Sequence, residues 1–266
     1  MGKRRDTLIR FTSSCYNRIK AIFTSSPPVS FPVEADQHEI DLIKTILGMR
    51  AGDEALSMVS VDRLWAAIAA VKYIEQNNID GDIVECGVWR GGCAIAMADT
   101  LRRMRSNKKV YLFDTFEGMT LPTKEDIMHD LDIPAQVLLD KSLSDKEHIN
   151  NVWCVASLED VKQKLNAFNV ADKCILVPGD VCLTLFESSN IPEKISLLRL
   201  DTDWYESTKV ELNQLYPLLS MSGILLVDDY GFWEGSRKAV DEFFNSQARQ
   251  PMQFVLDQTG RGYVKI

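Results

Sequence analysis

The feature that most constrains the fold is an alternation of short apolar runs with longer helical patterns. Helical periodicity fills most of the intervals between the strand-like runs. The strand-like runs are 82–86, 109–113, 174–177, 195–200 and 223–227. The helical patterns cover 36–49, 60–77, 91–105, 157–168, 206–219 and 236–247. This alternation predicts an α/β domain with a doubly wound, mostly parallel sheet, and residues 252–266 supply a C-terminal antiparallel strand.

Charge divides the 266-residue chain into two parts. Residues 1–26 carry six basic residues and one acidic residue, a net charge of +5, so the remainder carries −13. An acidic body is a poor partner for nucleic acid, because phosphates are bound by cationic surfaces. Pro27-Pro28 ends the basic stretch, and we expect a basic N-terminal segment at 1–30 and one domain over 31–266.

Two hypotheses remain open for residues 1–26. Their apolar residues recur at helical spacing, which suits a disordered tail or a helix that docks in an oligomer. The same basic, weakly amphipathic pattern also suits peripheral contact with an anionic membrane.

Hydropathy and cysteine usage favour a cytoplasmic protein. No apolar run approaches the roughly 20 residues that span a bilayer. Arg10 and Arg18 interrupt any apolar core of a secretory signal. The six cysteines form no CxxC pair and no cluster with histidine, which argues against a zinc site or a disulfide framework.

Acidic residues stand at the ends of four of the five predicted strands. In doubly wound sheets, ligands bind outside the carboxyl ends of the strands, near the point where the strand order reverses. These acids are therefore the first candidates for chemistry. They are Glu85, Asp114, Asp201, Asp203, Asp228 and Asp229.

The loop from Glu85 to Gly92 follows the first strand and opens a helix. It is neither a GxGxxG fingerprint nor a P-loop. A carboxylate at Glu85 would repel phosphate but would accept hydrogen bonds from a ligand ammonium, and Asp114 is placed to take both hydroxyls of a ribose. A nucleoside with an amino-acid tail satisfies both acids, which predicts S-adenosylmethionine. The alternative is a plain tight turn between strand and helix.

Four carboxylates, those of Asp201, Asp203, Asp228 and Asp229, should converge at two strand ends. Like charges so close cannot all stay ionised without a counter-ion. A hard divalent cation with oxygen ligands resolves the conflict, and Mg2+ is the usual choice. It would orient a substrate hydroxyl and lower its pKa, while a nearby carboxylate takes the proton. The alternative is a set of helix N-caps, since Asp203 precedes a helical pattern.

Four segments in order resemble the macrocin-O-methyltransferase (TylF/MycF-like) family over roughly residues 36–248. They are Asp82-Ile-Val-Glu-Cys-Gly-Val-Trp-Arg-Gly-Gly, Leu112-Phe-Asp-Thr-Phe-Glu-Gly-Met, Leu200-Asp-Thr-Asp-Trp-Tyr-Glu-Ser-Thr and Val227-Asp-Asp-Tyr-Gly. The resemblance implies a Rossmann-like methyltransferase fold, a homo-oligomer, and Mg2+-dependent transfer of the methyl group of S-adenosylmethionine to a hydroxyl. The implied acceptor is a sugar of a glycosylated natural product, a nucleotide-sugar or a polysaccharide.

Carried over residue by residue, the resemblance implies two sets of ligands. Asp201, Asp228 and Asp229 would hold Mg2+, and Asp203 would be the catalytic base. The cofactor site would comprise Glu85, Gly87, Val88, Trp89, Asp114, Ser157, Leu158, Gly179 and Asp180.

An insertion at 117–150 is too long and polar for a plain connection, and we expect it to form a lid. His129, within it, is the alternative base, against the simpler interpretation of an exposed lid histidine. Two alternative functions also remain: an Mg2+-dependent hydrolase that modifies nucleotide-sugars, and a non-catalytic S-adenosylmethionine-binding protein.

Overall fold

The computed structural model describes residues 29–144 and 153–266. The chain divides into two compact units, Met1–Ala35 and Asp36–Ile266, and every element below belongs to the second. The predictions made for residues 1–26 lie outside the described residues. Within the described ranges, no helix is both long enough and apolar enough to cross a membrane.

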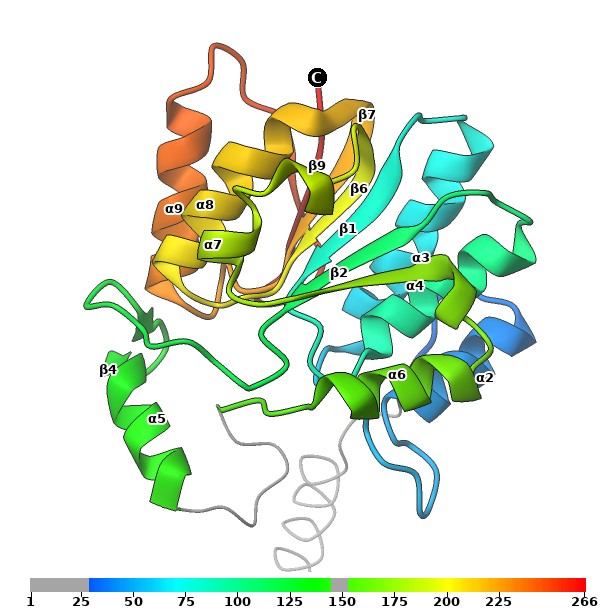
Figure 1. The fold of residues 1–266 in the computed structure, drawn as a ribbon, viewed down its shortest axis with the longest axis horizontal. Coiled ribbons are helices and arrows are strands. Elements are labelled where there is room, and N and C mark those ends of the chain that lie inside the picture. Colours follow the sequence, from blue (N-terminus) through cyan, green and yellow to red (C-terminus); the bar gives the residue numbers. More distant parts are fainter. Residues whose placement is uncertain (1–28, 145–152) are drawn as a thin grey trace, which may run out of the picture. The chain divides into compact units, whose positions relative to one another are not determined.

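The second unit is built on a seven-stranded sheet with the order β5-β2-β1-β6-β7-β9-β8 (Figure 1). The five strands from β5 to β7 in this order are parallel, whereas β9 runs antiparallel to both β7 and β8. This arrangement confirms the predicted fold class. The strands are β1 (Asp82–Cys86), β2 (Val110–Asp114), β5 (Cys174–Pro178), β6 (Ile195–Leu200), β7 (Leu219–Val227), β8 (Gln253–Val255) and β9 (Arg261–Val264).

The strand order reverses between β1 and β6. From β1 the chain moves outward through β2 to β5, and it then returns to β6 on the other side of β1. The backbone N–H of Asp201, just past the end of β6, donates to the carbonyl of Cys86, the last residue of β1, at 2.8 Å. The predicted strand-end acids therefore flank the switch point, where open α/β sheets bind ligands.

Helices cover both faces of the sheet (Figure 1). On one face α3 contacts α4, β6 and β7, and on the other α8 packs against α9 and β6. Alternate residues of β1 and β6, such as Val84 and Leu198, join the core cluster that includes Leu212 of α8. Because side chains alternate along a strand, Glu85 and Arg199 point to the opposite face, toward α3 and α4.

Each of the six predicted helical ranges holds a helix, but the helix predicted over 206–219 ends at Leu215, and α7 has no counterpart in the prediction. Strand β7 accordingly begins at Leu219, earlier than the predicted run 223–227. The α-helices outside the insertion are α2 (Gln37–Ile46), α3 (Val61–Gln76), α4 (Gly92–Arg103), α6 (Leu158–Ala167), α7 (Val181–Thr184), α8 (Tyr205–Leu215) and α9 (Glu234–Asn245). The 3-10 turns are η1 (Ala171–Lys173), η2 (Ser188–Asn190) and η3 (Tyr216–Leu218).

The insertion, described as far as residue 144, has secondary structure that the sequence did not predict. It contains β3 (Ile127–Met128) and β4 (Ile133–Pro134), which pair antiparallel, followed by α5 (Ala135–Ser144). The carboxylate of Asp126 accepts from the backbone N–H of Tyr205 at 2.7 Å. Buried residues of α5 also pack with Trp204 and Trp233 in a small core cluster. The described part of the insertion is thus anchored to the α8–α9 layer.

Candidate active site

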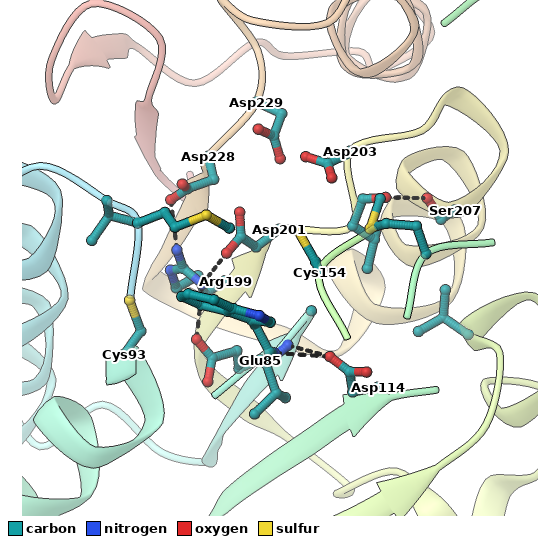
Figure 2. A pocket seen from close by; sticks show the side chains of 18 of the residues that line it. Glu85, Cys93, Asp114, Cys154, Arg199, Asp201, Asp203, Ser207, Asp228 and Asp229 are labelled. Atoms are coloured by element: carbon teal, nitrogen blue, oxygen red, sulfur yellow. Dashed lines mark hydrogen bonds and ion pairs between the residues drawn. The ribbon is translucent and has the colours of Figure 1, made fainter. Parts of the chain in front are cut away.

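A cavity of about 320 Å³ lies at the carboxyl ends of the strands around the switch point (Figure 2). It is lined by all the predicted site residues except Ser157 and Leu158. Ser157 is instead the N-cap of α6, where its hydroxyl accepts from the backbone N–H of Asp160 at 3.2 Å, and Leu158 is the first residue of that helix. His129 is not among the lining residues either.

The buried carboxylate of Glu85 lines this cavity, and only one of its two oxygens is hydrogen-bonded. Its Oε1 accepts from Nη1 of Arg199 at 2.8 Å, whereas its Oε2 has no hydrogen-bond partner among the described residues. Burial, only partly offset by Arg199, raises the pKa of Glu85 to about 7. The indole Nε1 of Trp89 is also buried and lacks a partner in the described structure. Buried polar atoms without partners beside a cavity are what a bound ligand would satisfy.

Asp114 fixes the loop that follows β1. Its Oδ2 accepts from the backbone N–H groups of Val88 (2.7 Å) and Trp89 (3.0 Å). Gly87 has φ +84°, and a Cβ there would lie 2.0 Å from the carbonyl oxygen of Asp201. Glycine is therefore required at this position, because the loop passes directly against the end of β6.

Gly179 and Asp180 form the part of the cavity wall that follows β5. The backbone N–H of Gly179 donates to the carbonyl of Asp114 at 2.9 Å. The Asp180 carboxylate caps α7 by accepting from the backbone N–H of Cys182 at 2.8 Å. This wall is thus hydrogen-bonded to the end of β2.

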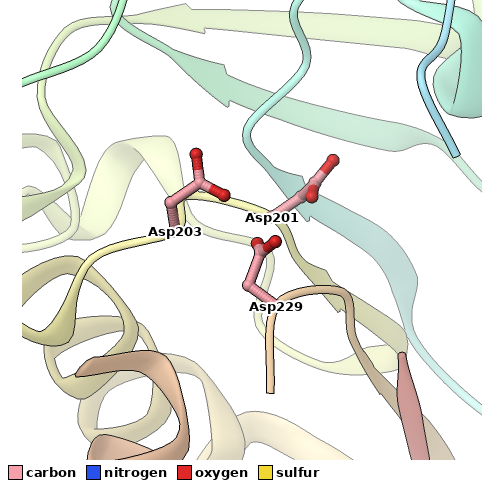
Figure 3. Close-up of side chains that lie close together, drawn as sticks. All are labelled: Asp201, Asp203 and Asp229. Atoms are coloured by element: carbon pink, nitrogen blue, oxygen red, sulfur yellow. The ribbon is translucent and has the colours of Figure 1, made fainter. Parts of the chain in front are cut away.

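Three of the predicted carboxylates form a compact group (Figure 3). One oxygen from each of Asp201, Asp203 and Asp229 lies within 4.8 Å of the others. Asp203 has φ +67°, a left-handed conformation that is uncommon for a non-glycine residue. Asp229 Oδ2 is buried and has no hydrogen-bond partner among the described residues.

Without a cation, the three clustered carboxylates repel one another when they are ionised. Burial raises the pKa of Asp203 to about 7, although a hydrogen bond with Asp229 counters part of the effect. Burial raises the pKa of Asp229 well above its ordinary value, and the neighbouring Asp203 and Asp228 add to the rise. Carboxylate oxygens gathered in this way suit a hard divalent cation, which would remove the repulsion.

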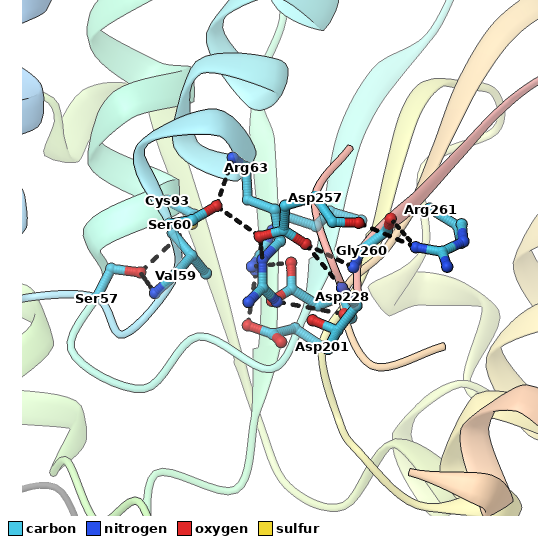
Figure 4. Close-up of polar contacts among 12 residues, drawn as sticks. Ser57, Val59, Ser60, Arg63, Cys93, Asp201, Asp228, Asp257, Gly260 and Arg261 are labelled. Carbon is cyan, nitrogen blue, oxygen red and sulfur yellow. Dashed lines mark hydrogen bonds and ion pairs between the residues drawn. The ribbon is translucent and has the colours of Figure 1, made fainter. Parts of the chain in front are cut away.

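Asp228, predicted as a metal ligand, lies outside this group. Its Oδ1 accepts from Nη2 of Arg199 at 2.8 Å, and its Oδ2 pairs with Nη1 of Arg63 (Figure 4). Both carboxylate oxygens are thus engaged by guanidinium groups. The third aspartate of the group is instead Asp203, which was predicted as the base.

Two arginines of the site are not among the residues predicted from the sequence. Arg199 lies in an apolar strand-like run, and Arg63 lies in a helical pattern. A signal existed for Arg199, because it is the one charged residue in the run 195–200 and a central strand buries such a residue only with partners. Arg63 also donates from Nε to Asp257 Oδ2 at 2.8 Å. No pattern linked residues so distant in sequence.

An aromatic wall flanks the carboxylate group. Phe232 and Trp233 line the cavity, and Trp233 packs edge-on against Trp204 with ring centroids 5.0 Å apart. His129 lies outside this wall, with an exposed side chain whose Nδ1 pairs with Glu234. The geometry therefore agrees with the interpretation of His129 as an exposed residue of the insertion.

Comparison with known proteins identifies the family. Residues 13–265 match the family described as macrocin-O-methyltransferase (TylF). A demethyldecarbamoylnovobiocin O-methyltransferase from Streptomyces niveus is 31% identical over 71% of this chain and 68% of its own length. An 8-demethyl-8-(2,3-dimethoxy-alpha-L-rhamnosyl)-tetracenomycin-C 4'-O-methyltransferase from Streptomyces olivaceus is 30% identical over 84% of this chain and 79% of its own.

A solved structure, that of the O-methyltransferase NovP, superposes with a TM-score of 0.72 at 26% identity, covering 86% of this chain and 98% of that one. These similarities support the methyltransferase prediction over the hydrolase and the non-catalytic binding protein. The chain belongs to the macrocin-O-methyltransferase family and is an S-adenosylmethionine-dependent O-methyltransferase.

Proposed function

We propose that the protein methylates a sugar hydroxyl of a glycosylated natural product, with S-adenosylmethionine as donor and Mg2+ as a second cofactor. One observation carries the proposal: a single cavity holds both a buried carboxylate oxygen without a partner, in Glu85, and the group of three aspartates. The relative from Streptomyces olivaceus is named for a rhamnosyl compound, which supports a sugar as the acceptor.

The donor half of the cavity suits the amino-acid and ribose parts of the cofactor. Glu85 Oε2 would accept from the ligand ammonium, and the Asp114 carboxylate would accept from the ribose hydroxyls. Bound S-adenosylmethionine supplies a methyl group already activated on a sulfonium. Val88, Gly179 and Asp180 line the same cavity, and their contacts with the cofactor stay predictions, as do those of Ser157 and Leu158.

The acceptor half suits a cation and a base. We assign Asp201 and Asp229 as the ligands, since Mg2+ usually takes one or two carboxylates and keeps positions for water or substrate oxygens. A bound Mg2+ would lower the pKa of the acceptor hydroxyl. Asp203, in the same group, would accept the hydroxyl proton. Asp228 would hold the two arginines in place.

The first experiment is transfer of a labelled methyl group from S-adenosylmethionine to a panel of glycosides, nucleotide-sugars and free sugars. Turnover should disappear in EDTA and return when Mg2+ is added in excess. Full turnover in the chelator would exclude the metal role. Methylation of nucleotide-sugars alone would exclude a finished glycoside as the acceptor.

A pair of variants separates the base from the ligands. In Asp203→Asn, turnover should fall roughly 100-fold or more. Affinities for S-adenosylhomocysteine and for Mg2+, measured by calorimetry, should stay near those of the native protein. In Asp229→Asn, Mg2+ affinity itself should fall.

The outcome for Asp203→Asn is decisive in either direction. A loss of Mg2+ affinity equal to that of Asp229→Asn would make Asp203 a ligand rather than the base. Unchanged turnover would move the base elsewhere, with His129 as the next candidate. We expect His129→Ala to retain turnover, because that side chain is exposed and does not line the cavity.

A further inference from the structure

One buried guanidinium joins the two halves of the cavity (Figure 2). Nη1 of Arg199 lies 2.8 Å from Glu85 Oε1 and 2.9 Å from Asp201 Oδ2. Nη2 lies 2.8 Å from Asp228 Oδ1. The Arg199 side chain is only 3% exposed, so these contacts are shielded from water. A single nitrogen thus contacts an acid assigned to the cofactor and an acid assigned to the cation.

The sheet register builds this contact directly. Arg199 and Glu85 are paired residues of the neighbouring strands β6 and β1. Asp201 stands two residues beyond Arg199, and Asp228 follows Val227, which pairs with Leu200. The three carboxylates therefore come from three adjacent strand ends around one central side chain.

The other end of the guanidinium is anchored as well. Asp228 pairs with Arg63, whose Nε donates to Asp257 at 2.8 Å (Figure 4). The same oxygen of Asp257 accepts from the Ser60 hydroxyl at 2.5 Å. Opposite charges therefore alternate from Asp257 through Arg63 and Asp228 to Arg199, and this chain restricts rotation of the Arg199 head group.

We propose that Arg199 is a positioning residue shared by the cofactor pocket and the group of three aspartates (Asp201, Asp203 and Asp229). It orients Glu85 and Asp201 through the same nitrogen. The inference rests on the function proposed above. A guanidinium is planar and presents its N–H groups in fixed directions, so its anchored plane sets how both carboxylates are turned. Because Arg199 holds Oε1 of Glu85, Oε2 stays available to the cofactor. The contact with Oδ2 of Asp201 fixes how that carboxylate is oriented within the group of three aspartates.

The test is Arg199→Lys, which keeps the positive charge but loses the planar fork. Calorimetry would measure two affinities separately: S-adenosylhomocysteine without metal, and Mg2+ without nucleoside. We expect both to fall roughly tenfold or more, because a loss of this size in metal affinity is usual when a partner that orients a metal ligand is removed, and Glu85 loses the same partner. By contrast, Glu85→Gln should lower only the first affinity and Asp229→Asn only the second.

A matched control is Arg50→Lys, because Arg50 also pairs with a carboxylate, that of Asp41, but on the surface. It should leave both affinities unchanged. Arg199→Lys would overturn the inference if, while folded by circular dichroism, it kept both affinities within about twofold of the native values, since charge alone would then suffice. A fall in only one affinity would also overturn it.

If Arg199→Lys does not fold, Asp228→Asn weakens the Nη2 contact instead. Both affinities should then fall by roughly threefold or more, and two unchanged affinities would overturn the inference. Failure of the native protein to bind S-adenosylhomocysteine would overturn the proposed function together with this inference. Normal native binding with unaffected variants overturns the inference alone.

Discussion

Gly87 is the residue at which the site's backbone has least room. At φ +84° any L side chain is strained, and a Cβ would meet the carbonyl oxygen of Asp201 at 2.0 Å. We expect Gly87→Ala to reduce the free energy of unfolding by more than the roughly 1–3 kcal/mol of backbone strain alone. Affinity for S-adenosylhomocysteine should fall with it.

Denaturant unfolding and calorimetry would check this, with Gly52→Ala as the control. Gly52 has φ +91°, but a Cβ there meets nothing within 4 Å, so it carries the strain without the clash. Equal losses of stability in the two variants would contradict the claim that the contact with β6 dictates glycine.

Glu211 gives a prediction about pH. Oε1 of Glu211 accepts at 2.8 Å from the hydroxyl of Thr202, which stands between Asp201 and Asp203. Burial raises the pKa of Glu211 to about 8 from an ordinary value of 4.5. Because the folded pKa is the higher one, the group's stabilising contribution is complete below pH 4.5 and is lost as pH rises through 8. The Tm of the metal-free protein should therefore decline from about pH 5 to 8.

In Glu211→Gln this decline should be shallower, while the exposed Glu206→Gln on the same helix should match the native protein. Thermal melts across that pH range would decide. An identical slope in Glu211→Gln would remove Glu211 as the cause and leave Glu85 and Asp203, whose pKa values are also raised by burial.

The sequence predicts the positions of the site's acids along the strands, but not which of them face one another. The acids could be placed at strand ends, because a parallel sheet gathers those ends at one edge. Which of the consecutive Asp228 and Asp229 would face the cluster could not be predicted, because that choice depends on the arginines reaching Asp228. Those arginines come from β6 and α3, and only the folded packing brings them together.

At the level of elements, the sequence predicted the sheet better than the insertion. The runs of the parallel strands are apolar and bounded by helices, so all five strands could be located, although β7 begins at Leu219 and not at the predicted residue 223. The hairpin strands β3 and β4 have two residues each, too few to show any period. Their position depends instead on tertiary contacts such as that of Asp126.

Asp126 offers a test of how the insertion is held. It is fully buried and accepts from backbone N–H groups of Tyr205 (2.7 Å) and Thr123 (2.6 Å). Asp126→Ala should lower stability by about 1–3 kcal/mol, because buried donors lose their acceptor. It should also raise the KM for the glycoside while S-adenosylhomocysteine affinity stays near native.

Steady-state kinetics and calorimetry separate these effects, and Asp130→Ala, at an exposed position of the same insertion, is the control. A matching loss of cofactor affinity in Asp126→Ala would argue against a local role. An unchanged KM would dissociate the insertion from acceptor binding.

At the scale of the whole molecule, the acidic part of the chain and the basic residues 1–26 can be tested separately. Every described residue that lines the cavity lies in the acidic part of the chain, within the unit Asp36–Ile266. Removal of residues 2–27 should therefore leave affinities for S-adenosylhomocysteine and Mg2+ unchanged, and turnover of water-soluble glycosides within about twofold. Loss of cofactor binding would contradict this, and loss of self-association in solution would assign the segment to an oligomer.

The charge chain from Asp257 to Arg199 bears on how this enzyme could be recombined with its relatives. Arg63 lies at the start of α3, whereas Asp257 lies in the turn between β8 and β9. A chimaera that exchanges only the last strands can therefore separate an ion pair that reaches into the catalytic cavity. Crossover points should keep position 63 and position 257 from the same parent, even though nearly the whole domain lies between them in sequence.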